Sequence, residues 1–148
     1  MVRLALGYPE YSDEQSLVLR KQSGNLLDLV EPVLKSDELE AMRAEVDKIY
    51  VDKKMVEYIV SLITATRNHP HILLGGSPRA TLALTSMSKA MAYMQSRDYI
   101  IPDDIPPIFT DTLSHRMIMR PSAASENVTV EDILSGILKS VPVPQVTA

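Results

Sequence analysis

The stretch Gly75-Gly76-Ser77-Pro78-Arg79-Ala80 marks the start of a long helix rich in Ala, Met and Leu. Ser77 is a good N-cap residue, and Pro78 suits the first helical position because its missing N–H would be unpaired there. Gly75 and Gly76 let the backbone enter closely or with a positive φ. Arg79 then lies in the first turn, where the helix dipole favours anions and disfavours cations. The stretch therefore predicts a helix start and a negatively charged partner for Arg79.

Composition favours a helical globular domain. Of the 148 residues, 45% are hydrophobic and 23% are charged, which is enough to build a core. With one Phe, no Trp and 8 Met, that core must be aliphatic and thioether-rich, which suits helix packing. A net charge of −4 argues against broad binding of nucleic acid, although a local basic pocket is compatible with it.

Cysteine content and hydropathy exclude several classes of protein. The absence of Cys excludes a disulfide scaffold, a cysteine nucleophile and a thiolate zinc site. No apolar run approaches the roughly 20 residues of a membrane span, and the N-terminus lacks the apolar region of a signal peptide. We therefore expect a cytoplasmic protein without a membrane span.

Local signals predict a strand and then a series of helices. Residues 2–9 begin with period-2 apolar character and end in a Gly/Pro break, which is typical of a short strand followed by a turn. The segment from Ser12 to Gln15 has a capping-box pattern and predicts a first helix that runs to about Gln22. Pro32 rules out a regular helix through residues 23–35, so an extended linking segment is expected there.

Five further helices are predicted from their N-terminal residues, which are Ser36, Asp52, Ser77, the pair Asp103-Asp104, and Thr129. The helix that starts at Asp52 should stop at His69-Pro70. The next-to-last helix continues through Leu113 to Ile118, unless Met117 to Pro121 turns extended. Residues 122–127 are predicted to form a loop.

The spacing of apolar residues predicts which face of each helix is buried. The predicted inward positions are, in chain order, Leu17 and Val18; Leu39, Met42, Val46 and Ile49; Val56, Ile59, Val60, Ile63 and Thr64; Leu84, Met87, Met91 and Met94; Ile108, Phe109, Leu113 and Ile118; and Ile133, Leu134, Ile137 and Leu138. The expected fold is a mainly all-α bundle of five to six helices, with a short N-terminal strand or extended segment and minor extended pieces.

No catalytic residue is predicted in this chain. A phosphate loop needs a longer Gly-rich segment that ends in Lys-Ser or Lys-Thr, and Gly75-Gly76-Ser77 is too short and has no following lysine. No Ser lies in a nucleophile elbow. The chain is therefore not expected to cleave a nucleoside triphosphate by itself.

Arg79 has two open interpretations from local chemistry alone. Its planar, permanently charged guanidinium matches a pair of phosphate oxygens. It could equally be a surface arginine paired with an acid. Lys53 and Lys54 also lie at a helix start, but they lack the Gly-Gly-Ser-Pro frame.

The other polar clusters are explained without chemistry. His69 and His71 fall short of the three or four ligands that a zinc site needs, so hydrogen bonding within a loop is expected and no metal site is predicted. Asp103 and Asp104 are explained by helix capping. His115-Arg116 with Arg120 forms a small basic patch whose role stays open.

Six segments, in order, resemble the C-terminal lid region of MoxR-family AAA+ ATPases, and together they span almost the whole chain. They are Leu6-Gly7-Tyr8-Pro9, Val30-Glu31-Pro32-Val33-Leu34, Thr66-Arg67-Asn68-His69-Pro70, Gly75-Gly76-Ser77-Pro78-Arg79-Ala80, Arg97-Asp98-Tyr99-Ile100-Ile101-Pro102-Asp103-Asp104-Ile105 and Leu113-Ser114-His115-Arg116. Six ordered matches are far more specific than any one of them.

This resemblance implies a helical lid that packs over a nucleotide held by a preceding α/β ATPase core. Arg79 matches the sensor-2 arginine, expected to touch the γ-phosphate, and Gly75, Gly76, Ser77 and Pro78 form the helix N-terminus that supports it. The resemblance also implies ATP and Mg²⁺ in the full-length protein, a hexameric ring and a chaperone-like action on a client protein. The expected partners are the protein's own core domain and the neighbouring subunits of the ring.

The resemblance also divides the chain. Residues 1–11 correspond to the end of the AAA+ core and the linker, 12–141 to the lid, and 142–148 to a flexible tail. The phosphate loop, the acidic Mg²⁺ site and the sensor-1 residue are missing from the sequence, so we expect a fragment that is inactive alone and binds no cofactor.

Two other classes of function are weighed against the lid. A free-standing helical module that binds a partner protein predicts the same fold, but in it Arg79 should be salt-bridged or peripheral. A helix-turn-helix DNA binder is disfavoured by the acidic balance of charge.

Overall fold

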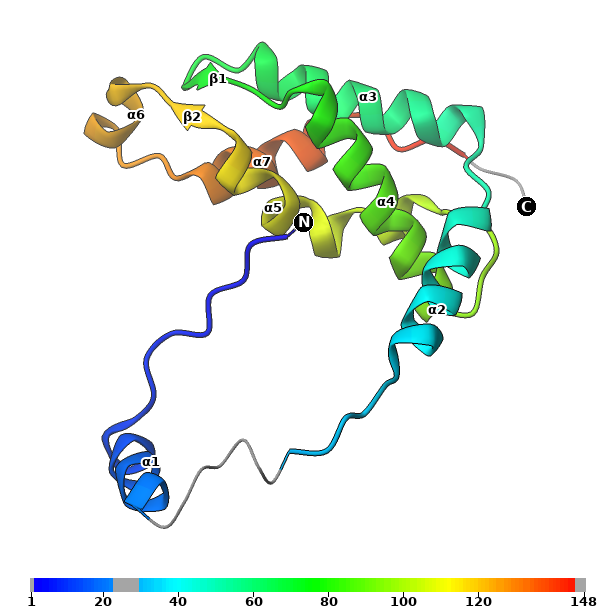
Figure 1. Ribbon diagram of the computed structural model, residues 1–148. Coiled ribbons are helices and arrows are strands. Elements are labelled where there is room, and N and C mark those ends of the chain that lie inside the picture. Colours follow the sequence, from blue (N-terminus) through cyan, green and yellow to red (C-terminus); the bar gives the residue numbers. More distant parts are fainter. Residues whose placement is uncertain (1, 23–29, 146–148) are drawn as a thin grey trace. The chain divides into compact units, whose positions relative to one another are not determined.

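The computed structural model describes residues 2–22 and 30–145 (Figure 1). Within these residues the chain forms seven α-helices and one two-stranded sheet, which confirms the mainly helical fold. The chain divides into two compact units, one of residues 4–42 and one of residues 1–3 with 43–148. No helix in the described part of the chain is long and apolar enough to cross a membrane.

The smaller unit contains α1 (Tyr11–Gln22) and the beginning of α2 (Ser36–Lys48). The first helix ends where predicted, but the prediction that Leu17 and Val18 point inward is wrong, since these side chains are 57% and 54% exposed. In α2, Leu39 and Met42 are exposed as well. Every described residue of this unit, over 4–22 and 30–42, is exposed.

Of the strand and the extended segment that stayed open for the N-terminus, the strand is wrong. Residues 2–9 belong to no strand, and Leu4 and Leu6 are exposed. A strand is stabilised by pairing with another strand, and no described strand lies beside this segment. In the predicted linking segment, residues 30–35 are non-helical as expected, whereas residues 23–29 lie outside the described part of the chain.

The larger unit is a bundle in which α3 packs against α4 and α7, and α5 packs against α4 and α7. Its elements are α3 (Lys53–Arg67), β1 (Ile72–Leu74), α4 (Pro78–Met94), a 3-10 turn (Pro102–Asp104), α5 (Pro106–Leu113), a second 3-10 turn (Ser114–Arg116), β2 (Ile118–Met119), α6 (Pro121–Ser125) and α7 (Val130–Ser140). The core is largely aliphatic and also contains the fully buried ring of Phe109 and the buried side chain of Tyr58.

Helix α3 begins and ends as predicted, and its buried face overlaps the predicted one, because Ile59 and Ile63 are buried as expected. The Asp52 carboxylate accepts a hydrogen bond from the Lys54 N–H at 2.7 Å and caps the helix. Val56 and Val60, predicted to be inward, are each 45% exposed. The buried residues are Met55, Tyr58, Ile59, Leu62, Ile63 and Thr66. Both sets have helical spacing, so packing against α4 and α7 selected between them.

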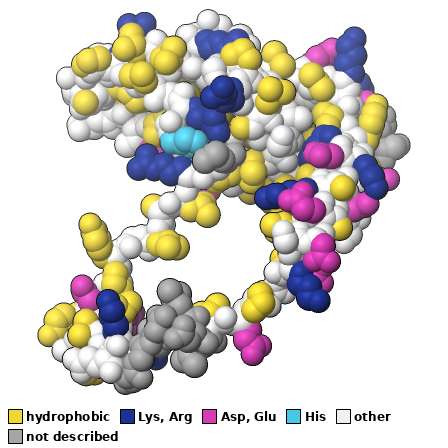
Figure 2. Space-filling view, in the orientation of Figure 1, with side chains coloured by type: hydrophobic (Ala, Val, Ile, Leu, Met, Phe, Trp, Pro, Cys, Tyr) yellow, Lys and Arg dark blue, Asp and Glu magenta, His cyan; other side chains and the backbone are white. Residues whose placement is uncertain are grey.

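The two strands form an antiparallel sheet that pairs Ile72 with Met119 and Leu74 with Ile118. Strand β1 was not predicted, because a strand of three residues is too short to show a period. Of the two alternatives for the segment after α5, the extended one is confirmed and the helix through Ile118 is wrong. Leu73, Leu74 and Ile118 are each more than half exposed, and Figure 2 shows exposed hydrophobic side chains over this part of the unit.

Helix α6 replaces the loop predicted over residues 122–127. Pro121 suits its first position, and Ala123 anchors it in the core with 1% exposure. Asn127, with φ at 54°, follows the helix. The prediction failed because five residues are too few for a periodic pattern.

Helix α7 follows the prediction closely. The Thr129 hydroxyl accepts from the Asp132 N–H at 3.1 Å, and the Asp132 carboxylate accepts from the Thr129 N–H at 3.1 Å, so both backbone donors are satisfied. Ile133, Leu134 and Ile137 are buried.

Helices α4 and α5 differ from the prediction at their ends. In α4, Leu84 is buried and Met87 and Met91 are partly buried, but Met94, predicted to be inward, is 74% exposed. The pair Asp103-Asp104 lies on the 3-10 turn Pro102–Asp104 and does not begin α5, which starts at Pro106.

Candidate functional site at the start of α4

The two glycines before α4 lie directly against the last turn of α3. A Cβ atom on Gly75 would lie 2.6 Å from Arg67 Cα and 2.7 Å from Arg67 N, which real Cβ atoms do not approach. One on Gly76 would lie 3.1 Å from Ile63 Cγ2. Neither glycine has a positive φ. Of the two predicted reasons for these glycines, close approach is confirmed and the left-handed conformation is wrong.

Hydrogen bonds hold this entry to α3. The Gly76 N–H donates to Thr66 Oγ1 at 2.9 Å, and the Thr66 hydroxyl donates to the Ile63 carbonyl at 2.6 Å. Arg67 Nε donates to the Gly76 carbonyl at 2.7 Å. Thr66 is fully buried. Both polar atoms of the Gly76 backbone are therefore bound to neighbouring residues of α3.

Ser77 and Pro78 occupy their predicted positions. Ser77 has extended backbone angles and is the N-cap of α4, and its carbonyl accepts from the Ala80 N–H at 2.8 Å. Its side chain makes no capping hydrogen bond, however, so Ser77 caps by backbone conformation alone. Pro78 is the first residue of α4.

Arg79 is the second residue of α4 and is exposed. Its side chain has no hydrogen-bond or ion-pair partner among residues 2–22 and 30–145. The guanidinium carries five donors and a fixed charge, and it lies where the helix dipole adds further positive potential. The geometry suits an incoming anion such as phosphate.

The family model for the AAA lid domain matches residues 64–137, from the last turn of α3 to the last turn of α7, and so includes the whole entry to α4. The chain belongs to the AAA lid domain family. Relatives agree with this assignment. The uncharacterized protein YeaC of Bacillus subtilis is 35% identical over 97% of this chain and 45% of its own length, and the chaperone MoxR1 of Mycobacterium tuberculosis is 26% identical over 100% of this chain and 41% of its own.

A solved structure shares the fold of this AAA lid. It is the crystal structure of a protein from Cytophaga hutchinsonii named as an ATPase, which superposes with a TM-score of 0.82 at 28% identity over 98% of this chain and 47% of that protein. The lid chain thus spans less than half the length of these relatives. Together these similarities confirm the resemblance to the lid region of MoxR-type AAA+ ATPases.

His69 and His71 lie together in the loop after α3. The His71 N–H donates to His69 Nδ1 at 3.3 Å, and His71 Nε2 lies 3.6 Å from the Glu126 carboxylate. Partial burial, and then the charge of His71, lower the pKa of His69 below its usual value. In the described part of the chain no group of three or more His, Asp or Glu residues could hold a metal ion.

The carboxylate of Asp104 is bound by Arg97, so it is not an unpaired acid at the start of a helix. The Arg97 guanidinium binds both carboxylate oxygens of Asp104, and the Ile101 N–H donates to Asp104 Oδ2 at 2.8 Å. The hydrogen bond to Asp104 is the main reason that the pKa of Arg97 is raised. Sequence reasoning did not predict this pair, although both residues lie in one of the six matching segments.

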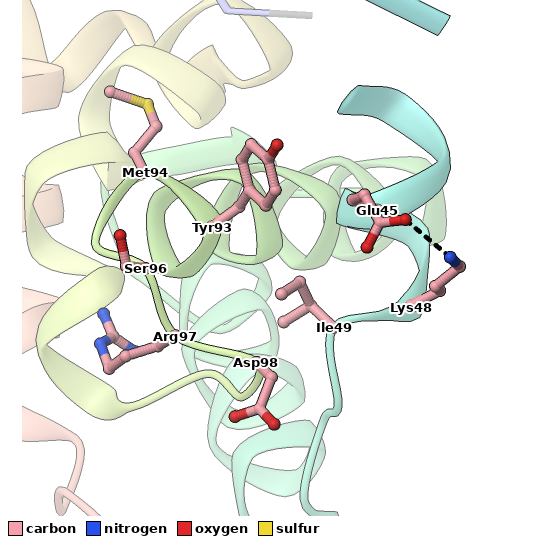
Figure 3. Close-up of a pocket in the computed structure, with 8 residues that line it drawn as sticks. All are labelled: Glu45, Lys48, Ile49, Tyr93, Met94, Ser96, Arg97 and Asp98. Carbon is pink, nitrogen blue, oxygen red and sulfur yellow. Dashed lines mark hydrogen bonds and ion pairs between the residues drawn. The ribbon is translucent and has the colours of Figure 1, made fainter. Parts of the chain in front are cut away.

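An open pocket of about 780 Å³ lies between the end of α2 and the end of α4 (Figure 3). Lys48 in its wall is bound to Glu45 at 2.7 Å, and Arg97 is bound to Asp104. Because both of its cations already have acidic partners, this pocket is a weaker anion site than the start of α4.

Thr66 and Arg67 were missed as contributors to the site. They carry no chemical pattern of their own, and the only signal for them was their place in a segment that resembles the family.

Proposed function

We propose that this chain closes over ATP bound by a P-loop core in a MoxR-type AAA+ ATPase, with Arg79 as the sensor-2 arginine. In this role the Arg79 guanidinium contacts the γ-phosphate and stabilises the charge that develops there during hydrolysis. The coupling of nucleotide state to the position of the lid follows from that contact.

One observation carries the proposal: Arg79 is an exposed cation without a described partner, on a helix start that two hydrogen bonds hold to α3. A cation in the first turn of a helix is mildly unfavourable unless an anion compensates it. A rigid backbone also lowers the entropy lost when the guanidinium binds. Both arguments support a phosphate partner.

The roles of the other segments of the chain and of the ATPase core are proposed from the family. Residues 1–11 lead from the core, residues 12–141 are the lid, and residues 142–148 are a tail. The core supplies the ATP and Mg²⁺ sites, and this chain supplies no catalytic residue beyond the phosphate contact. Since one relative is named a chaperone, we propose a chaperone-like action on a client protein in a hexameric ring.

The test is the variant Arg79→Ala in the ATPase that carries this lid and its P-loop core. Loss of one preorganised donor to a developing charge lowers turnover by about 10²-fold, so ATP hydrolysis should fall on that scale. Lys53→Ala is the matched control, because Lys53, like Arg79, is an exposed cation in the first turn of a helix. Lys53→Ala should leave hydrolysis unchanged.

Unchanged hydrolysis and ATP affinity in Arg79→Ala would refute the sensor-2 assignment and favour the free-standing interaction module. Titration of the isolated chain with ATP adds a second check, because one arginine is a fraction of a nucleotide site. We expect no binding by the isolated chain and binding by the full ATPase.

A further inference from the structure

The last turn of α3 holds the backbone just before Arg79 through two hydrogen bonds. Thr66 binds the N–H of Gly76 and Arg67 binds its carbonyl, at 2.9 and 2.7 Å. Figure 1 shows the end of α3 beside the start of α4, with β1 following α3. We infer that Thr66 and Arg67 are positioning residues for Arg79, an inference that rests on the proposed function of Arg79.

The hydroxyl of Thr66 is the central element of this arrangement. Gly76 is buried, so its N–H has no access to water and depends on Thr66 for a partner. The same hydroxyl donates to Ile63, which orients its lone pair toward Gly76. Without the hydroxyl, the backbone that brings Gly75 against α3 loses one of the two side-chain hydrogen bonds that hold it.

The backbone between Gly76 and Arg79 is short and has little conformational freedom. Only Ser77 and Pro78 lie between Gly76 and Arg79, and the ring of Pro78 fixes its own φ. The direction in which α4 begins is therefore set at Gly76. A shift of the Gly76 backbone moves Arg79 with it.

The hydrogen bonds from Thr66 and Arg67 to Gly76 also connect Arg79 to the core of the larger unit. Thr66 lies on the buried face of α3, whose Leu62 and Ile63 pack in the core. A force on Arg79 from a bound phosphate thus reaches α3 through two hydrogen bonds as well as through α4. Arg79 and α3 should move together when the lid moves.

The first test is Thr66→Val in the full ATPase, which keeps the shape of the side chain and removes the hydroxyl. Misplacement of a positioned group by about 1 Å costs up to 10²-fold in rate, so we expect kcat to fall by about 10-fold. Thr66→Ser, which keeps the hydroxyl, should restore turnover. Ser88→Ala is the matched control, because Ser88 is also fully buried and donates to the Leu84 carbonyl, but far from Gly76. It should reduce thermal stability without reducing kcat.

The second test separates positioning from a direct or purely structural role. Combined with Arg79→Ala, Thr66→Val should produce no additional loss of turnover, because the group that it positions is gone. If Thr66→Val fails to fold, Arg67→Ala takes its place, since Arg67 is exposed. It should likewise lower kcat only when Arg79 is present.

Two results would overturn the inference while leaving the proposed function intact. In one, Arg79→Ala impairs hydrolysis but Thr66→Val and Arg67→Ala leave it unchanged. In the other, these variants still lower turnover in the Arg79→Ala background. Failure of the proposed function itself is distinguishable, because Arg79→Ala alone would then have no effect.

Discussion

Arg97 binds Asp104 through two guanidinium nitrogens, with Nη1 3.0 Å from Oδ2 and Nη2 in contact with Oδ1. Asp104 is 4% exposed, and the same guanidinium also donates to the Tyr99 carbonyl at 2.8 Å. The pair joins the turn after α4 to the 3-10 turn before α5. Such a pair is costly to break, because Arg97, whose side chain is only 21% exposed, would remain partly buried without its partner.

Asp104→Ala should therefore destabilise the larger unit strongly. Removal of one partner of a buried pair costs about 3–5 kcal/mol, and the Ile101 N–H loses its acceptor as well. Asp103→Ala is the control, because Asp103 is exposed, and it should cost less than about 0.5 kcal/mol. Urea denaturation of both variants measures the difference. Equal stability of the two would contradict a structural role for the pair.

Substitutions of glycine by alanine should have opposite effects at two positions. Gly75→Ala places a methyl group 2.6 Å from Arg67 Cα, so backbone must move, and we expect a loss of about 1–3 kcal/mol. Gly136 lies inside α7 with open space around it, and alanine there should stabilise the helix by about 0.5–1 kcal/mol. Melting temperatures should move in opposite directions. A neutral Gly75→Ala would mean that the entry to α4 is not as tightly packed as the distances indicate.

The N-cap residues of α7 and α4, Thr129 and Ser77, should differ in how much stability is lost when their hydroxyls are removed. Thr129→Ala removes a capping box and should cost about 0.5–2 kcal/mol. Ser77→Ala removes a hydroxyl that makes no capping hydrogen bond, so its cost should be smaller. Chemical denaturation of the pair tests this order, and a larger loss for Ser77→Ala would contradict it.

Stability should fall as the pH drops below about 6.5 because of His69. The pKa of His69 is lowered in the folded state, so between that lower value and the unfolded-state value the unfolded chain binds more protons. The free energy of unfolding in this window therefore increases with pH, and the contribution of His69 reaches its full value above the unfolded-state pKa. Protonation of Nδ1 would also remove the acceptor for the His71 N–H.

The check for His69 is denaturation of the wild type and His69→Gln at several values between pH 5 and 8. The substitution should flatten the pH dependence in that window. His115→Gln serves as the control for the loss of a histidine, because His115 is exposed and lies on the 3-10 turn Ser114–Arg116, outside the loop of His69. A wild-type slope that survives in His69→Gln would assign the effect to another group.

Local hydrogen-bond chemistry made several helix starts predictable. Asp52 and Thr129 satisfy backbone donors within three residues of themselves, so the signal for these caps lies in the adjacent sequence. The buried face of α3 was harder to predict from the sequence, because two overlapping apolar stripes have the same helical spacing. Packing against the neighbouring helices determines which of them is buried. Short elements such as β1 and α6 carry too few residues for any period.

The sequence by itself determined the mainly helical class, the ends of α3, the start of α4 and the family, because each rests on residues that are close together in the chain or on the order of segments along it. The tertiary structure alone decided why Gly75 must be glycine, which residues hold the backbone before Arg79, and that Arg97 pairs with Asp104. These features depend on the distance between surfaces of different elements. That distance is set by packing and hydrogen bonding across the fold, which no local pattern of residues records.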